Sequence, residues 1–285
     1  MTEWREWQAW RRVTAVSLDA VSSAAAVGAG AAAALEQLAS SVAAYAPESY
    51  PEAIEDAVEL LVDRQAVRAP VLALCNQIYL VLGEGPERVV EVAREFAERL
   101  NASTAKIGAE GASLIGEGMT VLVHGSSRSV RAVLDSAKER TSFQVCCTVS
   151  MHGGQGLEMA AELTHAGFDV EVLDDDSAVE FLPGFDLVLS GADALGPRRA
   201  VTKAGIRRLA SAAMVAGVDR YLTAGRDKIL PVDLFRITSQ LSWRRSLSEV
   251  VELDQFTAIV SDVGILAIDE IPDLTIERSV APELA

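Results

Sequence analysis

Glycine, serines and an arginine follow a short apolar run in the turn His124-Gly125-Ser126-Ser127-Arg128. A glycine there lets a ligand approach the backbone closely, and Ser126 or Ser127 can cap the helix that follows. The free amide groups and the dipole of a helix N-terminus attract anions. The turn is therefore a candidate phosphate-binding site, with an ordinary capped strand-to-helix turn as the alternative interpretation.

A carboxylate follows another apolar run, in the sequence Gly191-Ala192-Asp193. The preceding residues, Leu187–Leu189, are all apolar, so we expect a strand that is buried on both faces. A carboxylate at the end of such a strand is costly to desolvate. We therefore expect Asp193 to act as a base, a metal ligand or an acceptor for hydroxyl groups. A cap for the next loop is the equal alternative.

Five cations lie within residues 198–208 of this acidic chain. We expect a helix over Thr202–Ala216, with Lys203 in its first turn. The other members of the group are Arg198, Arg199, Arg207 and Arg208. The group has the charge to neutralise a bound phosphate. A solvated helix face is the alternative, and it suits the arginines of the helix better than Lys203.

Histidine and cysteine give no pattern for metal or thiol chemistry. The histidines lack metal-ligand spacing, and no Ser-His-Asp arrangement can be assigned, so we expect neither a metal nor a cofactor. The cysteines are odd in number and lack the spacing of a disulfide framework, which indicates a reducing cytoplasm. Cys146 and Cys147 should point to opposite faces of one strand, into the core. The residues concerned are His124, His152, His165, Cys75, Cys146 and Cys147.

The elements that must position these residues are strands that alternate with helices. The expected strands are Thr120–Val123, Phe143–Thr148, Val170–Leu173, Leu187–Leu189 and Tyr221–Thr223, with two short ones at Phe256–Val260 and Ile265–Ile268. This order predicts a parallel sheet with helices on both faces. Ligands of such sheets bind outside the carboxyl ends of the strands, where the polar turns lie.

The amino-terminal part of the chain has helical periodicity throughout. Trp4, Trp7 and Trp10 recur at helical spacing, and most often such a stripe is core packing. The stretch Val21–Leu38 is rich in alanine but contains Gly, Ser and Glu, so we expect a helix of the domain and no membrane span. The periodicity changes near Gly118. We therefore expect an all-helical domain over residues 1–118, an α/β domain over residues 119–285, and a loosely ordered tail from residue 273.

The net charge of −16, from 41 acidic and 25 basic residues, excludes one class of function. Such a surface repels the phosphate backbone of nucleic acids. A local group of cations can still hold a small phosphorylated molecule. We therefore expect a small-molecule ligand and no direct binding to nucleic acid.

Together these turns resemble the family of the α, β and δ subunits of eukaryotic initiation factor 2B. Its enzymatic relatives are 5-methylthioribose-1-phosphate isomerase and ribose-1,5-bisphosphate isomerase. The resemblance covers roughly residues 55–270 and is strongest in Val121–Arg128, Asp176-Ser177-Ala178, Asp186–Ala194, Thr202–Gly205 and Ala258–Gly264. It implies a helical amino-terminal domain, a Rossmann-like carboxy-terminal domain, and a homodimer or larger oligomer formed through the latter.

The resemblance also implies a ligand site. In the isomerases, a Cys after the first strand and an Asp in the Gly-Ala-Asp sequence form the acid/base pair, and an Arg after the second strand binds phosphate. Asp193 matches the carboxylate, whereas Gly125 replaces the thiol and Met151 replaces the arginine. The ligand-binding positions implied are Gly125, Ser126, Ser127, Arg128, Asp176, Ser177, Gly191, Ala192, Thr202, Lys203 and Lys228.

Three functions follow from this combination. The first is an initiation factor 2B-like protein that binds a sugar phosphate or a nucleotide, with a regulatory role and without the isomerase chemistry. The second is an aldose-ketose sugar-phosphate isomerase with Asp193 as acid/base, and His124 is its candidate second group unless it points into the core. The third is an assembly subunit whose pocket is vestigial.

Overall fold

A computed structural model describes residues 4–20, 22–150, 154–243, 247–276 and 278–285. The chain forms two compact units. The helical unit comprises the chain up to Ala102, together with Leu230–Leu241 and Arg278–Ala285. The α/β unit comprises Ser103–Ile229 and Ser242–Glu277. The expected fold class, helices followed by a mostly parallel sheet with helices, is confirmed.

Four complete helices and parts of two others build the helical unit. They are α1 (Gln8–Ser17), α2 (Ala24–Tyr45), α3 (Tyr50–Gln65), α4 (Ala69–Val81), the first part of α5 (Pro86–Gly111) and most of α10 (Val232–Trp243). Proline stands in the first turn of α3 and of α4, where its missing N–H costs nothing. In the tryptophan stripe, Trp4 is buried and meets Trp10 edge to face at 4.9 Å between ring centroids, whereas Trp7 and Trp10 are half-buried.

The carboxyl end of the chain is ordered, which corrects the expected loose tail. It contains α11 (Ile271–Ile276) and a short 3-10 turn at Pro282–Leu284. Asn76 of α4 holds the last residues on both sides, because its amide donates to the Ser279 carbonyl and accepts from the Ala281 amide. Residues 278–285 therefore belong to the helical unit. The periodicity predicts instead a single division of the chain at residue 118.

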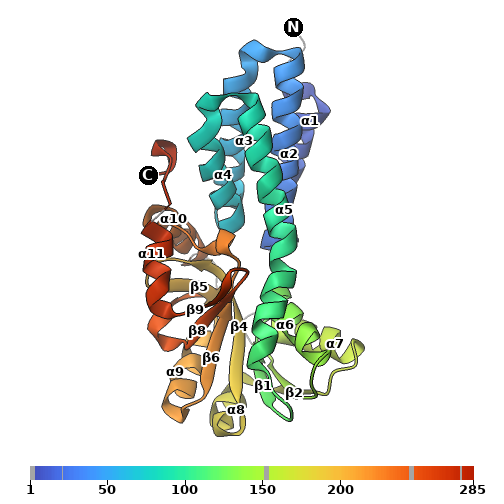
Figure 1. The fold of residues 1–285 in the computed structure, drawn as a ribbon, viewed down its shortest axis with the longest axis vertical. Coiled ribbons are helices and arrows are strands. Elements are labelled where there is room, and N and C mark those ends of the chain that lie inside the picture. The colour runs from blue at the N-terminus through green and yellow to red at the C-terminus, as the bar shows by residue number, and fades with distance from the viewer. Residues whose placement is uncertain (1–3, 21, 151–153, 244–246, 277) are drawn as a thin grey trace. The chain divides into compact units, whose positions relative to one another are not determined.

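The α/β unit is built on a nine-stranded sheet. The strands are β1 (Thr120–His124), β2 (Gln144–Thr148), β3 (Val170–Leu173), β4 (Leu187–Leu195), β5 (Arg199–Lys203), β6 (Asp219–Thr223), β7 (Ser248–Glu252), β8 (Ala258–Ser261) and β9 (Gly264–Leu266). The main order is β3-β2-β1-β4-β6-β8-β9, parallel except for β9. Central strand β4 lies between β1 and β6 (Figure 1).

Helices cover both faces of this sheet. On one face, α6 (Arg128–Lys138), α7 (Gln155–His165) and the end of α5 pack against Val121, Val123 and Cys147. On the other, α8 (Asp175–Glu180) and α9 (Ile206–Ala216) pack against Leu122 and Cys146. The neighbouring cysteines thus belong to separate cores, which confirms the alternation expected for a strand.

Two expectations about strand ends are wrong. Strand β4 does not stop at Leu189 but continues to Leu195, and residues 199–203 form strand β5 rather than the start of a helix. Both segments are extended because β5 pairs antiparallel with β4 on one side and with β7 on the other. Tertiary pairing of this kind overrides the local pattern of charges that suggested a helix.

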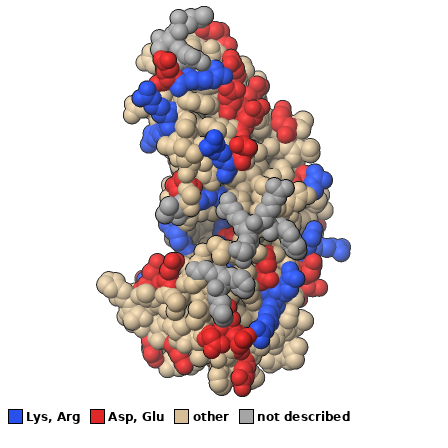
Figure 2. Space-filling view, turned by 180° about the vertical axis from the view of Figure 1, so that it is seen from behind, with Lys and Arg blue, Asp and Glu red and all other residues tan. Residues whose placement is uncertain are grey.

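No helix among the described residues is long and apolar enough to cross a membrane. On the face shown in Figure 2, the Lys and Arg side chains of these residues lie in separate groups among Asp and Glu. Among the described residues seen on that face, Lys and Arg form no continuous basic surface of the kind that a nucleic-acid backbone requires.

Helix α7 approaches β2 so closely that Gly156 has no room for a side chain. A Cβ at this position would fall well inside the van der Waals radius of the Thr148 carbonyl oxygen. We expect Gly156→Ala to lower the free energy of unfolding by about 1–3 kcal/mol, because the helix must move away from the strand. Urea denaturation followed by circular dichroism measures the loss. Gly184→Ala is the matched control, since nothing lies within 4 Å of a Cβ there, and equal losses in both variants would contradict the close approach.

Candidate ligand-binding site

Three charged side chains lie near one another, in the last part of β4, at the end of β5 and in the turn after β6. The Lys203 ammonium donates to Asp193 Oδ2 at 3.1 Å, and the two side chains are 26% and 33% exposed, so a solute can reach them. The Lys228 ammonium donates to the Ala192 carbonyl at 2.7 Å. Asp193 and Lys203 come from paired strands, and Lys228 comes from the turn after β6. The structure thus brings together three of the residues that the sequence singled out.

An irregularity in the pairing of β4 with β5 places Asp193. Ala192 pairs with Thr202 and Ala194 pairs with Val201, so Asp193 has no partner of its own in the ladder. Such a bulge bends the strand and redirects a side chain. Asp193 lies beside Lys203 at this bulge. The expected turn at Gly191-Ala192-Asp193 is therefore a strand with a bulge, and Lys203 stands at a strand end rather than in a first helical turn.

Burial makes the charge of Lys228 unfavourable. Desolvation lowers the pKa of its ammonium, the Asp193 carboxylate opposes that shift, and the nearby Lys203 adds to it. Two ammonium groups and one carboxylate therefore share a small region of an otherwise acidic chain. An anion bound there would offset the repulsion between the two lysines.

The turn after β1 supplies backbone and hydroxyl groups. Ser127 is the N-cap of α6 and accepts from the Val130 amide, which confirms the expected capping. Gly125 has φ +74°, and a Cβ there would lie 3.1 Å from Lys203 Cγ. The aliphatic stem of Lys203 therefore lies against the position where the isomerase relatives are expected to carry a thiol. Gly191 lies close to this turn, since a Cβ on it would lie 2.5 Å from Ser127 Oγ.

Ser126 and Arg128 complete the turn. Ser126 is partly exposed, and Arg128 opens α6 with an exposed side chain. Met151, the position of the absent arginine, lies outside the described residues.

His124 is a buried residue that holds the backbone. It is 1% exposed, with Nε2 3.0 Å from the Ala204 carbonyl and Nδ1 2.8 Å from Thr148 Oγ1. A carbonyl can only accept, so Nε2 carries the proton, and in the neutral ring Nδ1 accepts from the Thr148 hydroxyl. With both ring nitrogens bonded inside the protein, His124 fixes the segment after Lys203 and has no nitrogen directed to a ligand.

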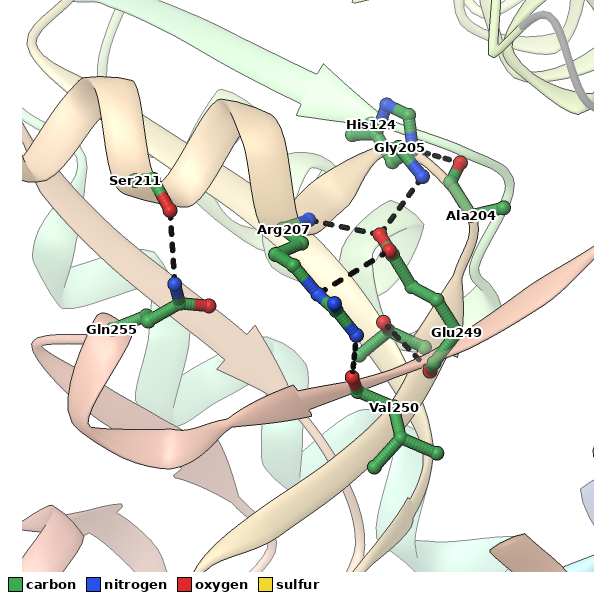
Figure 3. Close-up of polar contacts among 9 residues, drawn as sticks. His124, Ala204, Gly205, Arg207, Ser211, Glu249, Val250 and Gln255 are labelled. Carbon is green, nitrogen blue, oxygen red and sulfur yellow. Dashed lines mark hydrogen bonds and ion pairs between the residues drawn. The ribbon is translucent and has the colours of Figure 1, made fainter. Parts of the chain in front are cut away.

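Glu249 of β7 occupies the N-terminus of α9 (Figure 3). Its Oε1 accepts from the Gly205 amide at 2.8 Å and from the Arg207 amide at 2.9 Å. The Arg207 guanidinium lies 3.7 Å from Oε2 and also donates to the Val250 carbonyl. The sequence did not indicate this role, because strand β7 follows residues with no clear period, and its pairing with β5 is a long-range contact.

Asp176 and Ser177 lie at the start of α8, away from the lysines. Asp174 caps that helix through the amides of both residues, and Ser177 also donates its hydroxyl to Asp174. Asp176 forms an exposed ion pair with Arg208. Neither residue therefore joins the cluster of Asp193 and the lysines. Their neighbour Asp175 turns inward instead and accepts from the Ser150 amide at 2.8 Å.

The other predicted residues of this region are also bonded to groups of the protein. Thr202 is fully buried and donates to the Glu249 carbonyl at 3.5 Å, so it links β5 to β7 rather than facing a ligand. Arg207 and Arg208 bind Glu249 and Asp176, in agreement with the helix-face interpretation. Within the described ranges, no group of three or more His, Cys, Asp or Glu side chains is arranged to hold a metal ion.

The cationic cluster lies at the edge of the parallel sheet where ligands of α/β proteins bind in general. The chain matches the Initiation factor 2 subunit family over residues 20–266 and belongs to that family. The resemblance of the strand-end turns is thereby confirmed.

Relatives in this family include enzymes and initiation factors. Ribose 1,5-bisphosphate isomerase of Methanocaldococcus jannaschii is 30% identical over 211 residues, which are 72% of this chain and 67% of that protein. The protein of the same name from Archaeoglobus fulgidus is 29% identical over 194 residues, 66% of this chain and 62% of that protein. The solved structure of translation initiation factor eIF-2B from Pyrococcus horikoshii OT3 has a TM-score of 0.75 at 20% identity, covering 91% of this chain and 97% of that one. The last comparison shows the shared fold.

The buried charge of Lys228 leads to a prediction about stability and pH. Because its folded-state pKa is lowered, the unfolded chain binds more protons in the window between the folded and unfolded values. Its destabilising contribution is therefore complete below the folded pKa and disappears as the pH rises toward the unfolded value of about 10.4. We expect Lys228→Met to be more stable than the natural protein at pH 7, with a gap in unfolding free energy that narrows as the pH rises toward the unfolded value.

Chemical denaturation from pH 7 to 10.5 measures that gap. Lys106→Met, which removes an exposed lysine of α5, is the control. A constant gap across the range, or a less stable Lys228→Met at pH 7, would contradict the assigned cost of burial.

Proposed function

We propose that this protein binds a phosphorylated sugar or a nucleotide at the cluster of Asp193, Lys203 and Lys228, and acts as a regulatory or binding protein without the isomerase reaction. One observation carries the proposal: the Lys203–Asp193 ion pair stands beside a second lysine, Lys228, at the carboxyl ends of the central strands. Ligands of parallel sheets bind at this edge.

The phosphate of the ligand is the part that the lysines recognise. Lys203 and Lys228 supply ammonium donors, and the N-terminus of α6, capped by Ser127, adds amide groups from the next strand end. When the Lys203 ammonium turns to a phosphate, the Asp193 carboxylate is released from its ion pair. It can then accept hydrogen bonds from ligand hydroxyl groups.

Neither of the two positions expected to supply a second proton-transfer group, 124 and 125, offers one, and this supports binding without turnover. Moving a proton between two sugar carbons requires a base and an acid within reach of the sugar. Asp193 provides one such group. Gly125 has no side chain, and both ring nitrogens of His124 are bonded to other groups of the protein.

A sugar-phosphate isomerase with Asp193 as acid/base is the second candidate. It is supported by relatives about 30% identical that are named ribose 1,5-bisphosphate isomerase, and by the retention of Asp193, Lys203 and Lys228. Assembly as a homodimer or larger oligomer through the α/β unit, and a cytoplasmic location, stay predictions from the sequence.

Calorimetric titration and thermal shift with ribose 1,5-bisphosphate, methylthioribose 1-phosphate and AMP test the proposal. We expect at least one of them to bind. Lys203→Ala should weaken it by about tenfold or more, because a charge-assisted hydrogen bond contributes roughly 1.5–3 kcal/mol. Lys106→Ala, which removes an exposed lysine of α5, should bind as the natural protein does.

Turnover assays on each binder separate the two candidates. We expect the bound sugar to be recovered unchanged. Isomerisation that disappears in Asp193→Asn would establish the enzyme and reject the regulatory function. Failure of every phosphate to bind would reject both.

A further inference from the structure

Asp262 is a buried carboxylate outside the cluster of Asp193 and the lysines. It directly follows strand β8 and lies within Ala258–Gly264, one of the segments in which the family resemblance is strongest. Its side chain is only 4% exposed, so its role lies inside the protein. Because a buried carboxylate must be satisfied by donors of the protein, those donors show which part of the chain it holds.

Three donors converge on the Asp262 carboxylate. Oδ1 accepts from the Arg226 amide at 2.7 Å and from the Ser261 hydroxyl at 3.2 Å. Oδ2 lies 3.3 Å from Arg226 Nε. Two of the three donors thus belong to Arg226, the first residue of the 3-10 turn Arg226–Lys228 that follows β6. Bonds to an ionised acceptor are stronger than neutral ones, so the start of this turn is fixed to the end of β8.

The turn after β6 is held by other contacts as well. The Ala224 amide donates to the Val260 carbonyl at 3.0 Å, which extends the pairing of β6 with β8 into the turn. A Cβ on Gly225 would fall well inside van der Waals contact with Ser103 Oγ of α5, and it would lie 3.5 Å from Asp262 Oδ1. The start of the turn therefore has little room to move between α5 and Asp262.

The far end of the same turn carries Lys228. The Lys228 amide donates to the Gly225 carbonyl at 2.9 Å and closes the turn, and its ammonium donates to the Ala192 carbonyl of β4 at 2.7 Å. Strand β6 lies between β4 and β8 in the sheet. The turn thus crosses the end of β6, with Asp262 holding it on the side of β8 and Lys228 contacting β4 on the other side.

We propose that Asp262 is a positioning residue of the ligand site: it holds the Arg226 end of the turn and thereby keeps the Lys228 ammonium beside β4, where it serves a bound phosphate. This inference rests on the proposed function. Asp262 does not touch the ligand, and it acts through the turn rather than through its charge. The charged groups that act on the Lys228 ammonium are Asp193 of β4 and Lys203 of β5.

Three variants at position 262 test this role. Asp262→Ala removes all three bonds, whereas Asp262→Asn keeps an oxygen that can accept from the Arg226 amide. Asp262→Ser, whose hydroxyl ends one atom short of the carboxylate oxygens, is a second disruptive variant. Asp174→Ala is the matched control, because Asp174 also directly follows a strand, β3, and accepts from backbone amides. Circular dichroism shows whether each variant is folded.

The first readout is the pKa of the Lys228 ammonium, measured by NMR on protein labelled with carbon-13 at the lysine ε-carbons. Single Lys→Arg variants assign the signals, because the chain has only four lysines: Lys106, Lys138, Lys203 and Lys228. Desolvation lowers the pKa of Lys228 in the natural protein. We expect Asp262→Ala and Asp262→Ser to raise it toward the ordinary value of about 10.4, since a released turn exposes the ammonium to water.

The direction of this change separates positioning from electrostatics. Removal of a negative charge by itself would lower the pKa of Lys228 further, whereas release of the turn raises it. We expect Asp262→Asn and Asp174→Ala to keep the low pKa of the natural protein.

The second readout is the calorimetric affinity for ribose 1,5-bisphosphate, methylthioribose 1-phosphate and AMP. For each compound that binds the natural protein, we expect Asp262→Ala and Asp262→Ser to weaken binding by about tenfold, the effect of one charge-assisted hydrogen bond. Asp262→Asn should restore most of this affinity, and Asp174→Ala should bind as the natural protein does.

An unchanged pKa of Lys228 or an unchanged affinity in the two disruptive variants would overturn this inference and leave the proposed function intact. Equal losses of affinity in Asp174→Ala would do the same. If Asp262→Ala and Asp262→Ser both failed to fold, Asp262 would belong to the stability of the whole fold, and the inference would also be overturned. A natural protein that binds none of the three compounds would overturn both proposals together.

Discussion

The antiparallel pairing of β5 with β4 is the constraint on which the site depends. Without it, the chain after Gly191 would have no strand to pair with, and neither Asp193 nor Lys203 would have a fixed position. The pairing carries the lysine back alongside the strand that bears the carboxylate, and the bulge between Ala192 and Ala194 leaves Asp193 outside the ladder. One local irregularity in hydrogen bonding thus joins two residues that are ten positions apart in sequence.

The same sheet geometry decides which polar groups serve the ligand and which serve the fold. His124 and Glu249 are both polar and lie close to Lys203, yet each forms hydrogen bonds to backbone groups of the Ala204–Arg207 segment. A buried polar group must be satisfied inside the protein. Asp193 and Lys203 bond to each other instead and remain partly exposed, so a solute can exchange with either partner. Polarity and proximity alone do not identify a ligand-binding residue here.

The sequence predicted the class of fold well, because alternation of short apolar runs with helical periods is a local property. It also located the edge of the sheet where Asp193, Lys203 and Lys228 meet. It failed at β5 and β7, because their extended form depends on pairing between segments about fifty residues apart, which no local pattern records. Asp176 and Ser177 were assigned from a resemblance, and the capping of α8 by Asp174 explains their types without a ligand. Glu249 was missed because its role depends on where the start of α9 lies, which the sequence does not show.

The contact between Gly125 and Lys203 has a consequence for how this family can change. A cysteine at position 125 would supply the thiol that the resemblance implies for the isomerases. The side chain would nevertheless require a left-handed backbone at φ +74° and would meet the stem of Lys203 at 3.1 Å. The turn and the lysine would have to adjust with it. A thiol at this position therefore requires coordinated replacements in the turn and around Lys203 rather than one substitution.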